Sequence, residues 1–222
     1  NKALSLLGDS ALLNINGTKL AFTTDSYVVK PLFFPGGDIG MLAVNGTIND
    51  LAVVGAEPMF LSAGFIIEEG FELSLLEKVA NSMKEAATLA SVEIVTGDTK
   101  VVEKGSVDGL YMNTCGIGIV NNGINLSYSL IEIGDKIIIS GTIGDHGMAV
   151  LSERESLGFT PSIKSDCAPL SGMIKQILAS GAHIKFMRDP TRGGLATTLN
   201  EIVNTQKYGI VIEEQTIPVN DG

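Results

Sequence analysis

Four aspartates stand beside small residues, and each one ends or interrupts an apolar stretch of the sequence. Carboxylates in such places are costly unless they are paired, hydrogen-bonded or bound to a metal. Oxygen ligands without histidine or cysteine suit Mg²⁺, which typically uses a few carboxylates together with substrate phosphates. The set therefore predicts a magnesium site that accepts a polyphosphate, whereas any one aspartate alone is equally well explained as a turn or cap residue. The four are Asp9, Asp25, Asp50 and Asp98.

Lys100 follows Asp98 by two residues in the string TGDTKVV. Alternate residues of a strand share a face, so we expect these two side chains to point the same way. A lysine beside a metal carboxylate can bind phosphate or transfer protons. Lys100 is therefore the candidate catalytic residue.

A second candidate anion site is the string RDPTRGG, in which Arg188 and Arg192 precede two glycines and a predicted helix. Helix N-termini after glycine loops bind anions, and arginines add forked donors. An ordinary capped loop explains the string equally well. His146 lies at another predicted helix start, where a structural role is favoured, and Cys115 and Cys167 are expected to be small packed side chains rather than nucleophiles.

The elements that must position these residues are strands and helices mixed along the chain. Asp38 is predicted to cap the first helix, and Ser74 with Glu77 to form a capping box at the second. The predicted elements are strands over residues 18–30, 91–102 and 109–120 and helices over about 39–54 and 74–90.

A turn at residues 121–123 leads into a second segment of the chain. The strings IEIGDKIIISG and GIVIEE have the composition of strands and stand at its start and end. Three helices are expected between them, from about His146, Pro169 and Leu195. We therefore predict an N-terminal domain over residues 1–122 and the first part of a second α+β domain over residues 123–222.

Composition limits the class of protein. The 25 acidic and 15 basic residues give a net charge of −10, which disfavours nucleic acid and anionic membranes as partners. The longest uncharged run, residues 109–131, holds too many asparagines and glycines for a membrane span. The two cysteines lack metal-site spacing and fit a reducing cytoplasm. Neither a signal peptide nor a natural stop is visible, so we expect the sequence to be cut at both ends.

Seven strings of the sequence resemble the HypE family of hydrogenase maturation factors, within the superfamily of aminoimidazole ribonucleotide synthetase and selenophosphate synthetase. The resemblance covers nearly all 222 residues. It implies a two-domain α/β (α+β) fold, with an N-terminal half that builds an ATP cleft and dimerises through its sheet and a truncated C-terminal half. The strings are TTDSYVVKPLFFPGGDIG, LAVNGTINDLAVVGAEP, FIIEEG, EIVTGDTKVV, SGTIGDHG, SDCAPL and RDPTRGGLATTLNEI.

The resemblance also implies the activity of an ATP-dependent carbamoyl dehydratase. In that family a C-terminal cysteine receives a carbamoyl group from HypF, ATP activates the carboxamide oxygen, and elimination leaves a thiocyanate. The cyanide passes through the HypC–HypD complex to the iron of [NiFe] hydrogenase. The family's terminal cysteine lies outside this sequence. By the match, Lys100 is an active-site lysine and the Mg-ATP residues are Asp9, Asp25, Asn49, Asp50 and Asp98.

Two other functions stay open at this point. One is a selenophosphate synthetase or another ATP-dependent relative that activates an oxygen by phosphorylation, against which the DPTRGG string argues. The other is a docking module for maturation partners that binds no nucleotide. Nucleotide titration separates the enzyme from the docking module.

Overall fold

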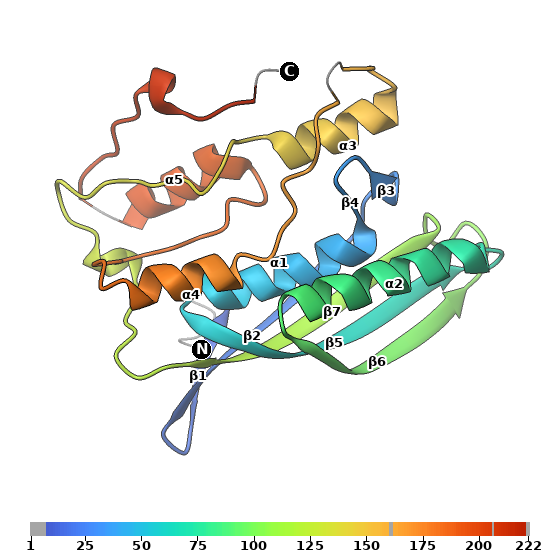
Figure 1. The fold of residues 1–222 in the computed structure, drawn as a ribbon, viewed down its shortest axis with the longest axis horizontal. Coiled ribbons are helices and arrows are strands. Elements are labelled where there is room, and N and C mark those ends of the chain that lie inside the picture. The colour runs from blue at the N-terminus through green and yellow to red at the C-terminus, as the bar shows by residue number, and fades with distance from the viewer. Residues whose placement is uncertain (1–7, 160–161, 206, 221–222) are drawn as a thin grey trace.

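The computed structural model describes residues 8–159, 162–205 and 207–220. One five-stranded sheet carries two long helices on one of its faces (Figure 1). The strand order is β1-β2-β7-β5-β6, in which only β5 and β6 pair in parallel, and a small hairpin joins β3 to β4. The strands are β1 Ala11–Ile15, β2 Thr18–Tyr27, β3 Phe33–Phe34, β4 Gly37–Asp38, β5 Ala56–Glu68, β6 Glu93–Val102 and β7 Leu110–Val120.

Helix α1, Ile39–Val53, lies across the middle of the sheet. Asp38 caps it as predicted, because Asp38 Oδ1 accepts from the backbone N–H groups of Gly40 at 2.7 Å and Met41 at 3.1 Å. The helix approaches β7 closely at Gly116, where a Cβ atom would lie only 2.8 Å from Thr47 Cγ2. Most of α1 is buried, which fixes the polar residues it carries at defined places against the sheet.

Helix α2, Leu73–Leu89, packs beside α1 on the same face of the sheet. Its apolar positions face inward as the spacing predicts, with Val79, Met83 and Ala86 buried. The predicted capping box is wrong. The helix begins at Leu73 with Glu72 as its N-cap residue, so Ser74 lies inside the first turn and its hydroxyl donates to Glu72 Oε2 at 3.5 Å instead.

Three helices follow in the second half of the chain, α3 Asp145–Glu155, α4 Ser171–Ala179 and α5 Gly194–Thr205. They begin within two residues of the predicted starts. Short 3₁₀ turns occupy Tyr128–Leu130 and Glu214–Thr216. No described helix combines the length and apolar character that crossing a bilayer requires.

The two strands predicted at the ends of this second half are wrong. Residues 131–141 and 209–213 run as irregular chain, Glu214 opens the second 3₁₀ turn, and Ile138 and Val211 are 87% and 92% exposed. A strand-like composition forms a strand only where a neighbouring backbone pairs with it. Within the described ranges neither segment has such a neighbour. The boundary between residues 122 and 123 stays a prediction.

The three predicted strands of the first half are confirmed as β2, β6 and β7, but β1 and β5 were not predicted. The helix-covered face of the sheet holds the main core. The opposite face carries apolar side chains in neighbouring pairs, Phe22 beside Ile117 and Phe60 beside Ile117, each about two-fifths exposed. The sheet therefore has one packed face and one apolar face that the described residues leave uncovered.

Candidate functional site

Three carboxylates from three distant parts of the sequence meet at one end of α1. Asp9 precedes β1, Asp50 lies in the last turn of α1, and Asp189 belongs to the loop before α5. One oxygen of each lies within 4.8 Å of the others. A set of closely spaced carboxylate oxygens is the donor set that a hard divalent cation such as Mg²⁺ prefers. The geometry supports the predicted roles of Asp9 and Asp50.

We call Asp9, Asp50 and Asp189 the acidic cluster. The hydroxyl group of Thr23 connects the elements that carry two of these residues. Thr23 Oγ1, on the buried face of β2, lies 2.9 Å from Asp50 Oδ2 and 2.9 Å from the backbone oxygen of Asp9, with both oxygens as acceptors. Ser10 Oγ donates to the backbone oxygen of Asp50 at 2.8 Å. Strand β2, the start of β1 and helix α1 are thus tied together directly at the cluster.

The cluster is electrostatically unfavourable when it holds no cation. Burial is the main cause that raises the pKa of Asp9 to about 7 and that of Asp50 to about 8, and the charge of Asp189 raises both further. Burial likewise raises the pKa of Asp189. Three half-buried acids that resist ionisation together gain most from a bound divalent ion. The site therefore fits the Mg²⁺ that the donor set predicts.

Arg188 places a guanidinium group against this cluster. Its Nε lies 3.3 Å from Asp9 Oδ1, and its Nη2 lies 3.0 Å from Glu201 Oε2 on α5. The charge of Arg188 lowers the pKa of Asp9 and of Asp189, against the effect of burial. The RDPTRGG loop thus joins the site. Arg192 of the same loop is exposed.

Asp25 and Asn49 border the cluster in different ways. Asp25 lies outside the group of three in the described residues, but its charge raises the pKa of Asp50 and of Asp189. Asn49 faces the second half of the chain, where its Nδ2 donates to Ala168 O at 3.0 Å and its Oδ1 accepts from Leu170 N at 2.8 Å. Asn49 therefore positions the segment next to the site, and Asp25 adds to its negative field.

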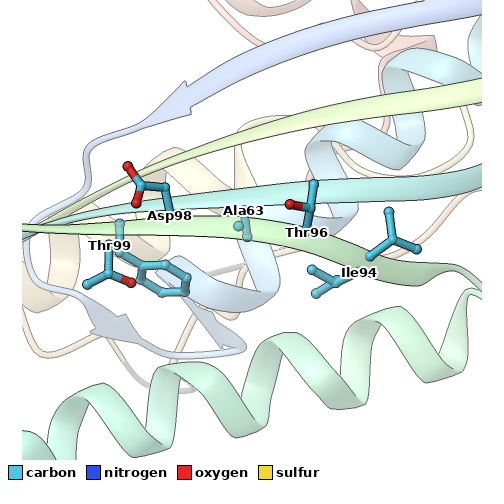
Figure 2. Close-up of a pocket in the computed structure, with 8 residues that line it drawn as sticks. Ala63, Ile94, Thr96, Asp98 and Thr99 are labelled. Carbon is cyan, nitrogen blue, oxygen red and sulfur yellow. The ribbon is translucent and has the colours of Figure 1, made fainter.

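Asp98 and Lys100 lie elsewhere in this chain. Both are exposed on the edge strand β6, where they pair in register with Gly64 and Ile66 of β5. This register puts both on the uncovered face of the sheet, as alternation predicts, and Figure 2 shows Asp98 and Thr99 on opposite sides of β6. Two strands separate β6 from β2, which is about 14 Å at the usual spacing. Within one chain, these two residues do not join the acidic cluster.

Asp189 was not predicted from the sequence, where the RDPTRGG string was singled out only for its arginines. The signal used for the other aspartates does not single it out, because Asp189 stands between an arginine and a proline in a polar loop. Asp189 lies close to Asp9, although the two are 180 residues apart in the sequence. A pattern of neighbouring residues cannot predict such a long-range approach.

The remaining polar candidates have structural partners. His146 Nδ1 lies 3.0 Å from Ser165 Oγ, and the His146 ring packs edge-on against Phe34. Cys115 Sγ donates to Thr24 Oγ1 at 3.1 Å, and burial raises the pKa of the Cys167 thiol. These features agree with the packing roles expected for both cysteines.

Profiles of one protein family match both halves of the chain. The AIR synthase related protein N-terminal domain matches residues 7–120, and the AIR synthase related protein C-terminal domain matches residues 132–222.

Known proteins resemble the chain over nearly all of its length. The carbamoyl dehydratase HypE of Rhizobium leguminosarum bv. viciae is 54% identical over 95% of this chain and 61% of its own. A crystal structure of a HypE–HypF complex matches at 54% identity with a TM-score of 0.94, over 100% of this chain and 72% of that one. A crystal structure of HypE in complex with ATP matches at 48% identity with a TM-score of 0.89, over 100% of this chain and 66% of that one. The chain spans between 58% and 64% of the length of the first curated relatives it matches.

Proposed function

Because this chain belongs to the HypE branch of the AIR synthase related protein family, we propose that the protein is an ATP-dependent carbamoyl dehydratase of [NiFe] hydrogenase maturation. The acidic cluster is the observation that carries this proposal. An acidic protein of net charge −10 needs a metal bridge to hold a polyphosphate, and the cluster offers one.

The proposed reaction converts an S-carboxamide on a C-terminal cysteine into a thiocyanate. The carboxamide oxygen takes the γ-phosphoryl group of ATP and leaves as inorganic phosphate, while the nitrogen loses two protons and the carbon–nitrogen bond becomes triple. The products are the thiocyanate, ADP and phosphate. A bound Mg²⁺ would neutralise charge on the phosphate oxygens. Asp9, Asp50 and Asp189 would hold that ion, Asp25 would add to the field that attracts it, and Asn49 would fix the adjoining segment.

Asp98 and Lys100 can act on the bound nucleotide only if a second copy of the chain brings its nucleotide to them. They lie on the uncovered face of the sheet, among exposed apolar side chains that a homodimer would bury. We propose that a homodimer forms through this face and that Asp98 and Lys100 of one copy act at the nucleotide of the other. Lys100 would then contact phosphate or move a proton there.

The proposed protein partners follow the same branch of the family. HypF would supply the carbamoyl group, and the known HypE–HypF complex supports this partner. The HypC–HypD complex would receive the cyanide. Both cysteines of the chain are free thiols, which fits the cytoplasm as the place of the reaction. A selenophosphate synthetase is less well supported, because the close relatives bear the dehydratase name.

Calorimetric titration with ATP, with and without Mg²⁺, tests the nucleotide site. We expect Mg-dependent binding that Asp50→Asn weakens by at least tenfold, the scale of removing a charged ligand. Asp108→Asn is the matched control, because Asp108 is an exposed acid paired with Lys30 at 2.7 Å. Equal affinity of the wild type and Asp50→Asn would remove Asp50 from the site. A wild-type protein without any nucleotide binding would favour the docking module.

A further inference from the structure

Arg188 is a permanent positive charge placed where the acidic cluster would hold a metal ion. Its Nε lies 3.3 Å from Asp9 Oδ1, and the two side chains are only 22% and 12% exposed. A guanidinium group keeps its proton at any physiological pH. Arg188 and Asp9 therefore form an ion pair that is shielded from water. The Coulomb attraction in such a pair is stronger than in a pair exposed to solvent.

Glu201 gives the same guanidinium group a second carboxylate. Glu201 Oε2 lies 3.0 Å from Arg188 Nη2, and the Glu201 side chain is more exposed than that of Asp9. Asp9 precedes β1 and Glu201 belongs to α5, so Arg188 spans two separate parts of the fold. One of its two carboxylates is a candidate metal ligand and the other lies outside the acidic cluster.

A metal ion bound by the acidic cluster would compete with Arg188 for Asp9. The three ionised carboxylates carry three negative charges, which a divalent ion and one arginine balance together. Mg²⁺ demands close contact with its oxygen ligands, so its arrival weakens the contact between Asp9 and Arg188. A displaced guanidinium group still paired with Glu201 would remain within reach of the phosphates of a metal-bound nucleotide. Arginine binds phosphate oxygens through paired donors.

We propose that Arg188 is an exchangeable counter-ion, which pairs with Asp9 while the cluster is without metal and moves onto the nucleotide phosphates when the metal–nucleotide complex binds. Glu201 keeps the guanidinium group within reach in both states. Arg188 is thus a positioning residue in the metal-free state and a phosphate ligand in the nucleotide complex. This inference rests on the proposed nucleotide site.

Two binding measurements on the full-length protein test the exchange. Mn²⁺ titration followed by electron paramagnetic resonance reports the affinity of the metal alone, and calorimetry reports the affinity of Mg-ADP. For Arg188→Gln we expect Mn²⁺ to bind several-fold tighter, because its competitor is gone. We expect Mg-ADP to bind about tenfold or more weakly, because a charged hydrogen-bond donor to phosphate is lost.

Arg188→Lys separates a direct contact from an effect of charge at a distance. Lysine keeps the charge and loses the planar fork. The exchange predicts Mn²⁺ affinity near that of the wild type together with weakened Mg-ADP binding. Arg154→Gln is the matched control, because Arg154 is exposed on α3, where its Nε donates to Lys30 O, and the substitution should leave the affinity for Mn²⁺ unchanged.

The opposite signs of the two effects make the test decisive. Weaker binding of both ligands in Arg188→Gln would show a residue that merely holds the loop in place, and unchanged Mg-ADP affinity would show that Arg188 does not meet phosphate. Wild-type affinities in Arg188→Lys would show that the charge alone suffices. Any of these results overturns the exchange and leaves the proposed function standing. Absence of Mn²⁺ and Mg-ADP binding in the wild type would overturn the proposed nucleotide site itself.

Discussion

Thr23 on β2 lies 2.9 Å from Asp50 on α1, with the threonine hydroxyl as donor and the carboxylate as acceptor. The contact links the sheet to the helix that carries Asp50, one of the three residues of the acidic cluster, and Thr23 is only 6% exposed. This hydrogen bond lowers the pKa of Asp50, against the larger effect of burial. A neutral side chain thus helps to keep a candidate metal ligand ionised.

Thr23→Val should weaken Mg-ATP binding while the protein stays folded. Valine has nearly the same shape, so the substitution removes the hydroxyl group without opening a cavity. We expect an affinity loss of about three- to tenfold, the scale of one hydrogen bond of about 1 kcal/mol. Calorimetry measures the effect. Thr88→Val is the control, because Thr88 is exposed on α2 and its hydroxyl donates only to Lys84 O of the same helix, at 2.7 Å. Unchanged affinity in Thr23→Val would mean that this contact does not tune Asp50.

Magnesium should stabilise the protein more at high pH than at low pH. The pKa values of Asp9 and Asp50 in the folded protein, about 7 and about 8, lie above the ordinary value of 3.8, so these groups ionise more readily in the unfolded chain. Without a divalent cation, Asp9 and Asp50 contribute their full share to the free energy of unfolding below about pH 4. That contribution falls as the pH rises towards about 8. Mg²⁺ binds the ionised carboxylates and opposes that loss.

Differential scanning calorimetry measures this dependence as the shift of Tm on addition of Mg²⁺. We expect a larger shift at pH 8 than at pH 6, and a smaller pH dependence in Asp50→Asn. An Mg²⁺-induced shift that is the same at both pH values would contradict a cation site built from these two acids.

Mixed dimers should reveal whether Asp98 acts across a subunit interface. If Asp98 serves the nucleotide of the second copy, Asp50→Asn and Asp98→Asn are each inactive alone but complement each other when mixed. Random exchange of subunits then restores about a quarter of the wild-type sites. Light scattering first establishes that the protein is a dimer. Absence of complementation in proven mixed dimers would return Asp98 to a role within its own chain.

Local sequence patterns predicted those parts of the site that depend on neighbouring residues. A carboxylate that interrupts an apolar helix, as Asp50 does, indicates an acid that is hydrogen-bonded or binds a metal. The structure provides a hydrogen bond from Thr23 and places two further carboxylates, Asp9 and Asp189, close enough to share a cation with Asp50. Alternation along a strand likewise predicted that Asp98 and Lys100 share a face. Asp38 as a helix cap depends on only four consecutive residues, 38 to 41, and was predicted for the same reason.

Contacts between distant parts of the chain could not be predicted from such local patterns. Asp189 reaches Asp9 across 180 positions, and nothing near Asp98 in the sequence tells which face of the finished sheet it occupies. Strand β5 was missed because it is paired on both sides within the sheet and lacks clean polar alternation. The segment at residues 209–214 was predicted as a strand because composition alone does not reveal whether a pairing partner exists.

Mass spectrometry of the carbamoylated full-length protein can show whether the ATP-dependent dehydration requires a cation held by Asp9, Asp50 and Asp189. The protein is first carbamoylated by HypF with carbamoyl phosphate and ATP, then given fresh Mg-ATP. Wild-type protein should lose one water from its carboxamide as the thiocyanate forms, whereas Asp189→Asn should accept the carbamoyl group and retain it. Thiocyanate formation by Asp189→Asn at the wild-type rate would contradict the account.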